Sequence, residues 1–345
     1  MKILVTGGAG FIGSHCVDAL LLLGHEVCVV DNLLSGREIN LDFARKLASE
    51  KKIKFEFVNG DISKPEVWDQ LAKSSWDGMF HLAAQTSVTA AVENPELDFR
   101  INVDSVNFIC NWARKTGLKY LVYANTAGAM YGAAEEFPTS ENHPCRPTTP
   151  YGATKNFFES YLGSLARSLK ASGVWSSNSK EKNYFSWLSL RLANVYGPRQ
   201  ITKGEAGVIP IFIEALRDGR RPTIFGNGSK TRDYVYVGDI ARAFVQGLQI
   251  LNEKCIDEGV NVGTGIETSD KEVFDSVRDS IRQTKTSLPG FDLATLDSPL
   301  LAAIRPGEIE RSCLNNQRAK QVLAGFVPKV AFRDGVDQTV RAYLS

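Results

Sequence analysis

The stretch KILVTGGAGFIG, residues 2–13, decides the fold of this chain. Its first five residues form an apolar run that predicts a short, buried parallel strand, and residues 14–24 predict the helix that follows. Three glycines between them fit the spacing G-x-x-G-x-x-G: Gly7, Gly10 and Gly13. Such glycines permit a tight turn, close approach of the backbone to a pyrophosphate, and packing of the helix on the strand. Because the N–H groups at a helix N-terminus attract phosphates, the stretch predicts a dinucleotide site.

A second apolar run, residues 26–32, predicts the next strand and contains a carboxylate at its end, Asp31. Asp31 follows Gly13 at close to the spacing of about 20 residues expected for the group that binds the adenosine ribose. Its negative charge would repel a 2′-phosphate, so it favours NAD over NADP, although Arg37 follows nearby.

Further strands are predicted at residues 54–58 and 78–85. The first leads into Asp61, which either meets the adenine or caps the next helix. The second contains His81, whose apolar context predicts a structural histidine, and ends in small residues that would let a cofactor cross the strand ends. Strands and helices alternate to about residue 190, which predicts an α/β, doubly wound parallel sheet. Beyond it, residues 208–216 predict a helix, and Asp239 predicts the cap of another.

Tyr151 and Lys155 lie four residues apart in TPYGATK, residues 149–155. On a helix such positions share one face, so the ammonium would lie close to the phenol and favour its ionised form. A phenol normally titrates near ~10, but beside a lysine and a positively charged nicotinamide it could accept a proton from a sugar hydroxyl. Many pairs of this spacing are merely surface residues; the preceding glycine motif favours a catalytic pair.

Composition narrows the class of protein. The 345 residues, 43% hydrophobic, suffice for one large or two modest domains. A formal net charge of +1 gives no reason to expect a nucleic acid or a membrane as partner. The six cysteines are scattered without C-x-x-C or metal-ligand spacing, so we expect reduced thiols and no metal. The first strand begins at residue 2 and no apolar run approaches the ~20 residues of a membrane span, so we expect a cytoplasmic protein.

Motifs along almost the whole chain resemble the extended short-chain dehydrogenases/reductases that act on nucleotide sugars, and most of all the UDP-glucose 4-epimerases. The similarity lies in TGGAGFIG (6–13), DNL (31–33), HLAAQ (81–85), YGATK (151–155), RLANVYGPR (191–199), FGNG (225–228), TRDYV (231–235) and RPGE (305–308). The resemblance implies a Rossmann-type NAD-binding domain, residues 1–190 plus about 236–258. A smaller, discontinuous α/β domain, about 191–235 plus 259–345, would bind the nucleotide sugar, and the helix that begins near residue 239 would return to the NAD domain.

The resemblance also implies roles for individual residues. The catalytic residues would be Tyr151, Lys155 and Thr126. The NAD-binding residues would be Gly7, Gly10, Phe11, Ile12, Gly13, Asp31, Asn32, Asp61, Ile62, Leu82, Ala83, Ala84, Gln85, Asn102, Tyr151 and Lys155. The residues in contact with the UDP-sugar would be Thr126, Asn194, Val208, Arg232, Arg305 and Glu308. The two arginines would hold the diphosphate, since guanidinium groups suit phosphate oxygens.

The chain departs from the family pattern before Thr126. The family carries three hydroxyl residues there, whereas this chain has Ala124-Asn125-Thr126, so Thr126 alone can fill the catalytic position. Nucleotide-sugar 4,6-dehydratases place an Asp-Glu pair directly afterwards, and this chain has Ala127-Gly128, which cannot transfer protons. Ser312 matches the position that crowds the C2 substituent in some relatives, and its small size predicts tolerance of an N-acetyl group.

The resemblance therefore implies a UDP-hexose 4-epimerase in which Tyr151 removes the proton of the sugar 4-hydroxyl and NAD+ holds the hydride during a transient 4-keto stage. Alternatives are a CDP-sugar 2-epimerase, a UDP-uronate 4-epimerase, a 4,6-dehydratase, or a catalytically silent NAD-binding regulator, because fold does not fix function. Relatives commonly dimerise through two helices of each subunit, here residues 102–115 and 151–169. The polar segment 172–183 looks like an insertion, and we expect a mobile surface loop there.

Overall fold

The computed structural model describes residues 1–202, 207–284, 297–304 and 309–345. Seven strands form one parallel sheet in the order β10-β6-β5-β4-β1-β2-β3. Their bounds are β1 Lys2–Thr6, β2 Glu26–Asp31, β3 Phe55–Asn59, β4 Gly78–His81, β5 Tyr120–Thr126, β6 Ser186–Leu192 and β10 Glu258–Val262. The doubly wound parallel sheet predicted from the sequence is confirmed.

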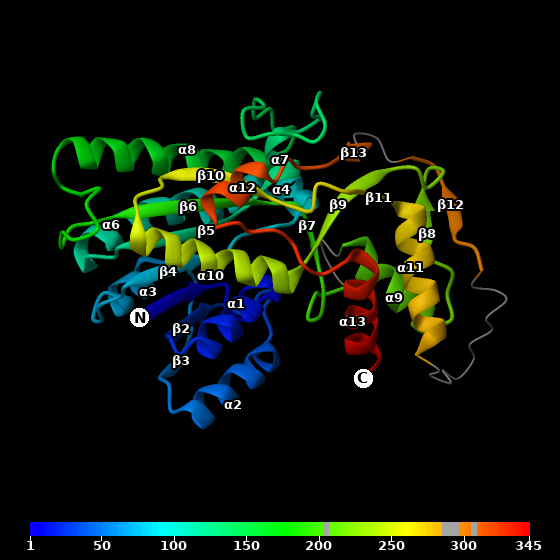
Figure 1. Cartoon of the computed structure of the whole chain (residues 1–345), viewed down its shortest axis with the longest axis horizontal. Helices are drawn as coiled ribbons and strands as arrows, with labels where there is room; N and C mark the ends of the chain where they lie inside the picture. The colour runs from blue at the N-terminus through cyan, green and yellow to red at the C-terminus, as the bar shows by residue number, and fades with distance from the viewer. Residues whose placement is uncertain (203–206, 285–296, 305–308) are drawn as a thin grey trace.

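Helices cover both faces of this sheet (Figure 1). One face carries α1 Phe11–Leu22, α2 Asp42–Lys51 and α10 Val237–Glu253, and the other carries α3 Pro65–Leu71, α6 Ser105–Thr116 and α8 Pro150–Ala171. Strand alternation divides the core between them, because Ile3 and Val5 face the first group whereas Leu4 faces the second. The inner strands β1, β2, β4, β5 and β6 are thus largely buried on both sides, as their apolar sequences predict, whereas the edge strand β3 is partly exposed. Within the described residues, no helix combines the length and the apolar composition needed to cross a bilayer.

A second, smaller set of elements lies beside the strand ends of the large sheet (Figure 1). It contains the strands β7 Asn194–Tyr196, β9 Thr231–Tyr236, β11 Glu267–Ser269 and β13 Arg311–Ser312 in one sheet, and β8 Thr223–Phe225 with β12 Leu300–Ala302 in another. Three helices, α9 Val208–Arg217, α11 Asp270–Gln283 and α13 Phe332–Leu344, enclose a separate core around Phe212, Phe274 and Val336.

The chain crosses between the two sets more than once. Helix α10 packs against α1 and the strands β5 and β6, as the resemblance implies for this helix. The short helix α12, Gln317–Val322, packs against β10, and Ala319 and Phe326 join the core of the large sheet. This packing puts a segment near residues 319–326 with the large sheet, whereas the predicted division assigns it to the sugar domain. The division into domains otherwise stays a prediction.

Several local predictions differ from the structure. Strand β4 ends at His81, and the following small residues are irregular. Helix α10 begins at Val237, so Asp239 lies inside its first turn and is not the cap. The Asp239 carboxylate instead accepts hydrogen bonds from the backbone N–H groups of Lys329 and Val330, which ties a distant segment to α10. Asp61 does not cap α3, because it accepts from Ser63 N in a local turn, which leaves the adenine contact as its predicted role.

The segment 172–183 is anchored more firmly than its polar composition suggests. Trp175 is 5% exposed and stacks on Phe185, with ring centroids 4.0 Å apart. The Asn183 side chain donates to the carbonyls of Gly173 and Val174, which closes the base of the loop. The rest of the expected surface loop is exposed or half-buried, and Trp175 is its one buried residue.

Replacing Trp175 with alanine tests this anchor. Removing a buried tryptophan side chain costs the transfer free energy of its ring and leaves a cavity, so the free energy of unfolding should fall by about 3 kcal/mol. The matched control is Val174→Ala, because Val174 is 42% exposed and the change should cost less than about 0.5 kcal/mol. Denaturant unfolding measures both, and equal effects of the two substitutions would contradict the anchoring role.

Candidate active site

The glycines of the loop between β1 and α1 let backbone segments approach one another closely. Gly7 has a left-handed backbone, φ 71°, and a Cβ added there would lie 2.6 Å from Ala83 N, beyond the end of β4. A Cβ on Gly13 would lie 2.1 Å from Gly7 O, so any side chain there would force α1 away from the loop. Helix α1 begins at Phe11, and no side chain caps its N-terminus. Its first N–H groups are therefore suited to bind the oxygens of a phosphate.

Asp31, predicted to bind the adenosine ribose, holds the glycine loop. Its Oδ2 accepts from Ala9 N at 3.0 Å, and its Oδ1 accepts from Leu33 N at 2.9 Å. Burial raises the pKa of Asp31, and these two N–H bonds oppose the rise. Asn32 Oδ1 accepts from Leu34 N next to it. Because the carboxyl ends of parallel strands lie at one edge of a sheet, these groups share that edge with the glycine loop.

Helix α8 carries Tyr151 and Lys155 and starts beside the end of β5. Thr149 caps the helix by accepting from Gly152 N at 3.2 Å, and Pro150 occupies its first turn. A Cβ on Gly152 would lie 2.2 Å from Ala129 O, so this glycine is what lets α8 approach α7, Ala127–Tyr131. Since Thr126 is the last residue of β5 and immediately precedes α7, this close packing brings the Thr126 segment next to the first turn of α8.

Lys155 is a buried cation, with 4% of its surface exposed. Its Nζ donates to Ala124 O at 2.7 Å and lies 4.2 Å from the centre of the Tyr123 ring. Burial lowers the pKa of Lys155 to about 7, and the charge of Asp98 opposes this change. The predicted helix contains both Tyr151 and Lys155, and it directs the ammonium to the carbonyl end of β5.

Asn125, the departure from the family pattern, faces the core. The Asn125 amide donates to Glu159 Oε2 at 2.8 Å, and its oxygen accepts from Thr126 N at 2.9 Å. Glu159 lies one turn beyond Lys155 on α8 and also accepts from Ser189 Oγ at 2.6 Å and Arg191 Nε at 3.1 Å. Asn125, which stands where the family has a serine, thus links the end of β5 to α8 by a hydrogen bond. Neither Glu159 nor this network was predicted, because nothing local in the sequence marks it.

Gln85 and Asn102, both predicted to bind the cofactor, meet each other beyond the end of β4. Asn102 Oδ1 accepts from Gln85 N at 3.0 Å, and Asn102 Nδ2 donates to Gln85 O at 2.9 Å. Asn102 lies in a π-helical turn, Arg100–Asp104, a form that often marks functional sites. Ile62 follows β3, and Leu82 and Ala84 follow β4, so all three lie beyond the carboxyl ends of strands of the same sheet.

The predicted sugar-binding residues come from the smaller set of elements. Asn194 opens β7 and is exposed, Val208 opens α9, and Arg232 lies in β9 with its Nη1 donating to Thr231 O at 2.8 Å. Ser312 pairs with Arg232 across β13 and β9, and a Cβ on Gly128 would lie 3.8 Å from Ser312 Oγ. Strand β13 therefore reaches the segment just after Thr126. Arg305 and Glu308 lie outside the described residues.

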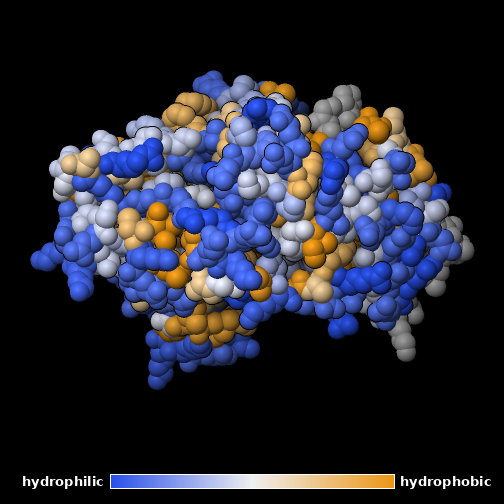
Figure 2. All heavy atoms as spheres, turned by 45° about the horizontal axis from the view of Figure 1, so that its top comes forward, coloured by the Kyte–Doolittle hydropathy of each residue, from blue (hydrophilic) through white to orange (hydrophobic). Residues whose placement is uncertain are grey.

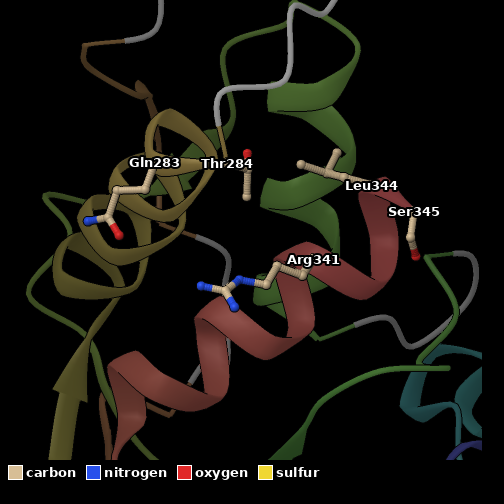
Figure 3. A pocket seen from close by; sticks show the side chains of 5 residues that line it. All are labelled: Gln283, Thr284, Arg341, Leu344 and Ser345. Carbon is tan, nitrogen blue, oxygen red and sulfur yellow. The ribbon is translucent and has the colours of Figure 1, made fainter.

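A hollow in the described part of the chain lies elsewhere, between the ends of α11 and α13. It has a volume of about 390 Å³ and is lined by residues of α11 and α13 and their ends: Gln283, Thr284, Arg341, Leu344 and Ser345 (Figure 3). None of the predicted site residues borders it, so the candidate site rests on chemistry at the sheet edge and not on the size of a cavity. Within residues 1–202, 207–284, 297–304 and 309–345, no cluster of three or more His, Cys, Asp or Glu side chains could hold a metal ion.

The NAD dependent epimerase/dehydratase family matches residues 3–263 of this chain. The chain belongs to this family. It is 39% identical over 343 residues to the UDP-glucose 4-epimerase of Mycolicibacterium smegmatis, covering 99% of this chain and 98% of that protein. The crystal structure of a UDP-glucose 4-epimerase from Thermotoga maritima with UDP-glucose is similar over 100% of this chain and 99% of that one, with a TM-score of 0.84 and 36% identity. The Thermus thermophilus UDP-glucose 4-epimerase in complex with NAD gives a TM-score of 0.81, 35% identity and the same coverage.

The buried charge of Lys155 predicts a pH dependence of stability in the cofactor-free protein. An unfolded lysine titrates near ~10.4, whereas burial lowers the pKa of Lys155 to about 7. Between these values the unfolded chain binds a proton that the folded chain does not, so this group favours folding more as the pH rises. Below pH ~7 both states are protonated, and the folded protein bears the full cost of the buried charge.

Lys155→Met should therefore stabilise the protein most below pH ~7, and its advantage should shrink as the pH rises toward ~10. Unfolding free energies measured from pH ~6 to ~9.5 give the slope. Lys46→Met is the control, because the Lys46 side chain is 75% exposed, and its difference from the parent protein should stay constant. A constant difference for Lys155→Met as well would contradict a buried ammonium.

Proposed function

We propose that this chain is an NAD-dependent epimerase that inverts C4 of a UDP-hexose, either the UDP-glucose/UDP-galactose pair or the N-acetylated pair. The observation that carries the proposal is the placement of a Tyr-x-x-x-Lys helix against the end of β5, at the same sheet edge as the glycine loop. Family membership and similarity over nearly the full length to UDP-glucose 4-epimerases support it.

The residues at the sheet edge fit a dinucleotide. A Cβ would fill the cradle at Gly7 and Gly13, and the uncapped start of α1 faces it, so the pyrophosphate would bind there. Asp31 would accept the adenosine ribose hydroxyls, with Asn32, Asp61 and Ile62 beside the adenine. The remaining proposed NAD contacts are Gly10, Phe11, Ile12, Leu82, Ala83, Ala84, Gln85, Asn102, Tyr151 and Lys155. NAD+, when bound there, would supply a reversible hydride acceptor for C4 of the sugar.

Side chains of the protein transfer the proton of the sugar 4-hydroxyl and hold the reacting groups in position. Tyr151, as phenolate, accepts the proton of the 4-hydroxyl and returns it after the sugar has turned, with Thr126 in the hydrogen-bond chain. Lys155 favours the phenolate through its positive charge and has further donors for the nicotinamide ribose. The Asn125–Glu159 bond keeps the end of β5, and hence Thr126, in place against α8.

The substrate must be held by its nucleotide, because the 4-keto sugar has to turn within the site. We propose Arg232 and Arg305 as the diphosphate ligands, Asn194 and Val208 as further substrate contacts, and Glu308 as the acceptor for the uridine ribose hydroxyls. Ionic hydrogen bonds from the guanidinium groups to the diphosphate would hold the UDP-sugar in the site while its hexose remains able to rotate. The small Ser312 near Gly128 leaves room for an N-acetyl group at C2.

The two residues directly after Thr126 favour epimerisation over elimination. A 4,6-dehydratase needs a proton donor and acceptor after Thr126, and here Ala127 is fully buried and Gly128 has no side chain. A CDP-sugar 2-epimerase and a UDP-uronate 4-epimerase share the Tyr-Lys layout, so products must decide among the epimerases. A catalytically silent regulator would not need a buried lysine four residues after a tyrosine on the helix that packs against β5.

The test is to incubate the purified protein with UDP-, CDP- and dTDP-sugars without added cofactor and to analyse the products by NMR. We expect UDP-glucose and UDP-galactose to interconvert, and UDP-N-acetylglucosamine to react as well. Turnover of UDP-glucose alone would refute the role given to Ser312. Conversion of CDP- or dTDP-sugars with none of the UDP-sugars would refute the proposed substrate class.

Tyr151→Phe should lower kcat by at least ~10²-fold, because general acid–base catalysis contributes typically ~10²–10⁴-fold. The control is Tyr161→Phe, the same substitution on the same helix, where the ring stacks on Phe157 and the hydroxyl has no proposed role. Initial rates with saturating UDP-galactose measure both variants. Full activity of Tyr151→Phe would rule out this tyrosine as the base.

We propose further that the enzyme is a cytoplasmic homodimer. The exposed face of α8 carries Phe157, 43% exposed, and the adjoining α4 (Val88–Glu93) and α5 (Pro95–Phe99) expose Val92 and Phe99. Figure 2 shows hydrophobic residues in small separate patches on a mainly hydrophilic face. Pairing of α6 and α8 with a second copy would cover the patch around Phe157. Light scattering on the purified protein should give twice the monomer mass, and a monomer at assay concentration would refute the dimer.

A further inference from the structure

A carboxylate with no role in the scheme above lies beneath Lys155. Asp98, in the short helix α5, is fully buried, which is rare for an aspartate without compensating partners. Its position is not part of any motif discussed so far. The partners that compensate its burial come from three different segments, and each of those segments borders the candidate NAD site.

Three donors converge on the Asp98 carboxylate. Its Oδ1 accepts from Gln85 Nε2 at 2.9 Å and from Asn102 Nδ2 at 3.0 Å. Its Oδ2 accepts from Thr154 Oγ1 at 2.7 Å. Asn102 closes the cluster, since its Nδ2 also lies 3.4 Å from Thr154 Oγ1. Asp98 therefore joins the segment after β4, the π-helical turn and the second turn of α8.

The charge of Asp98 also acts on Lys155, the neighbour of Thr154. Burial lowers the pKa of Lys155, and Asp98 is the charge that raises it again. In return, burial raises the pKa of Asp98, whereas its hydrogen bonds and Lys155 lower it. A buried carboxylate and a buried ammonium thus each favour the ionised form of the other.

The other titratable groups near Lys155 do not supply the negative charge that favours its ammonium form. His81, on β4, has its pKa lowered to about 3 by burial and is neutral. Burial raises the pKa of Tyr123, on β5, well above its ordinary value, so it is neutral too. Glu159, on α8, pairs with Arg191. Tyr151, on the same helix, is the group that the lysine is proposed to activate.

We propose that Asp98 is a positioning residue of the active site. Its carboxylate fixes the three segments that surround Lys155 and supplies the negative charge that balances the Lys155 ammonium. The inference deepens the proposed function and rests on it for the catalytic consequence, because a neutral Lys155 could neither favour the phenolate nor bind the ribose as a cation.

Asp98→Asn tests the charge with little change of shape. Loss of the carboxylate should let Lys155 lose its proton at lower pH, so the basic limb of the pH profile of kcat should move down by about one pH unit. Above that limb, turnover should be about tenfold lower than in the parent enzyme, because one pKa unit changes the protonated fraction tenfold. Glu96→Gln removes an exposed carboxylate from the same helix and should leave the profile unchanged.

Cofactor-free protein gives readouts that need no turnover. Titration calorimetry should show NAD binding about fivefold weaker in Asp98→Asn, because the neutral amide oxygen accepts more weakly from Gln85 and Asn102 than a carboxylate and the amide NH2 cannot accept from Thr154. The rise of stability with pH that Lys155 contributes should also begin at lower pH in this variant. If the parent protein lacks epimerase activity but these two shifts occur, the proposed function fails and the role of Asp98 stands.

If Asp98→Asn does not fold, Thr154→Val and Thr154→Ser test the positioning role of Asp98 through its hydrogen bond with Thr154. The valine variant keeps the Asp98 charge and removes the hydroxyl bond, so NAD binding and kcat should both weaken while the basic limb stays in place. Serine should restore both. The proposal is overturned if Asp98→Asn keeps the basic limb and the NAD affinity of the parent protein, or if Thr154→Val binds NAD and turns over as the parent does.

Discussion

A single cation buried beneath the carboxyl edge of a parallel sheet constrains the rest of the site. A lysine pays a high desolvation cost in the interior unless carbonyls, rings or opposite charges surround it. Lys155 has all three: the Ala124 carbonyl, the Tyr123 ring and the charge of Asp98. Because those partners come from β5 and α5, the lysine fixes where α8 must lie. The tyrosine one turn earlier is thereby held at the end of β5.

Glycines also fix the positions of these elements, because they lack a side chain at points where two backbone segments are in contact. Gly152 allows α8 to touch α7, and Gly7 and Gly13 allow the first loop to touch the end of β4 and the start of α1. The glycine loop follows β1, and the helix that carries Tyr151 and Lys155 packs against β5; only β4 separates these two strands in the sheet. The smaller set of elements reaches this edge through β13, where Ser312 lies near Gly128.

The sequence predicted features that depend on local patterns. The strand–glycine–helix start, the alternation of elements and the helix that carries Tyr151 and Lys155 follow from apolar periodicity and short motifs, and the structure has them all. It did not predict Asp98, Thr154 or Glu159, because their partners lie on segments distant in the chain and no spacing rule connects them. Asp239 was misjudged as a cap for a similar reason, since its partners at Lys329 and Val330 lie about 90 residues away. The roles of Arg305 and Glu308 stay predictions, as those residues lie outside the described part of the chain.

In the proposed reaction, hydrogen leaves C4 of the sugar as hydride and returns to the same carbon without entering solvent. The most direct measurement uses UDP-galactose deuterated at C4, in ordinary water without added cofactor, with the position of the label in the product read by NMR. We expect the UDP-glucose that forms to keep the deuterium at C4. Unlabelled UDP-galactose converted in heavy water should give UDP-glucose without deuterium at C4. Loss of the label to solvent would show that the carbon is deprotonated instead, and would contradict the account.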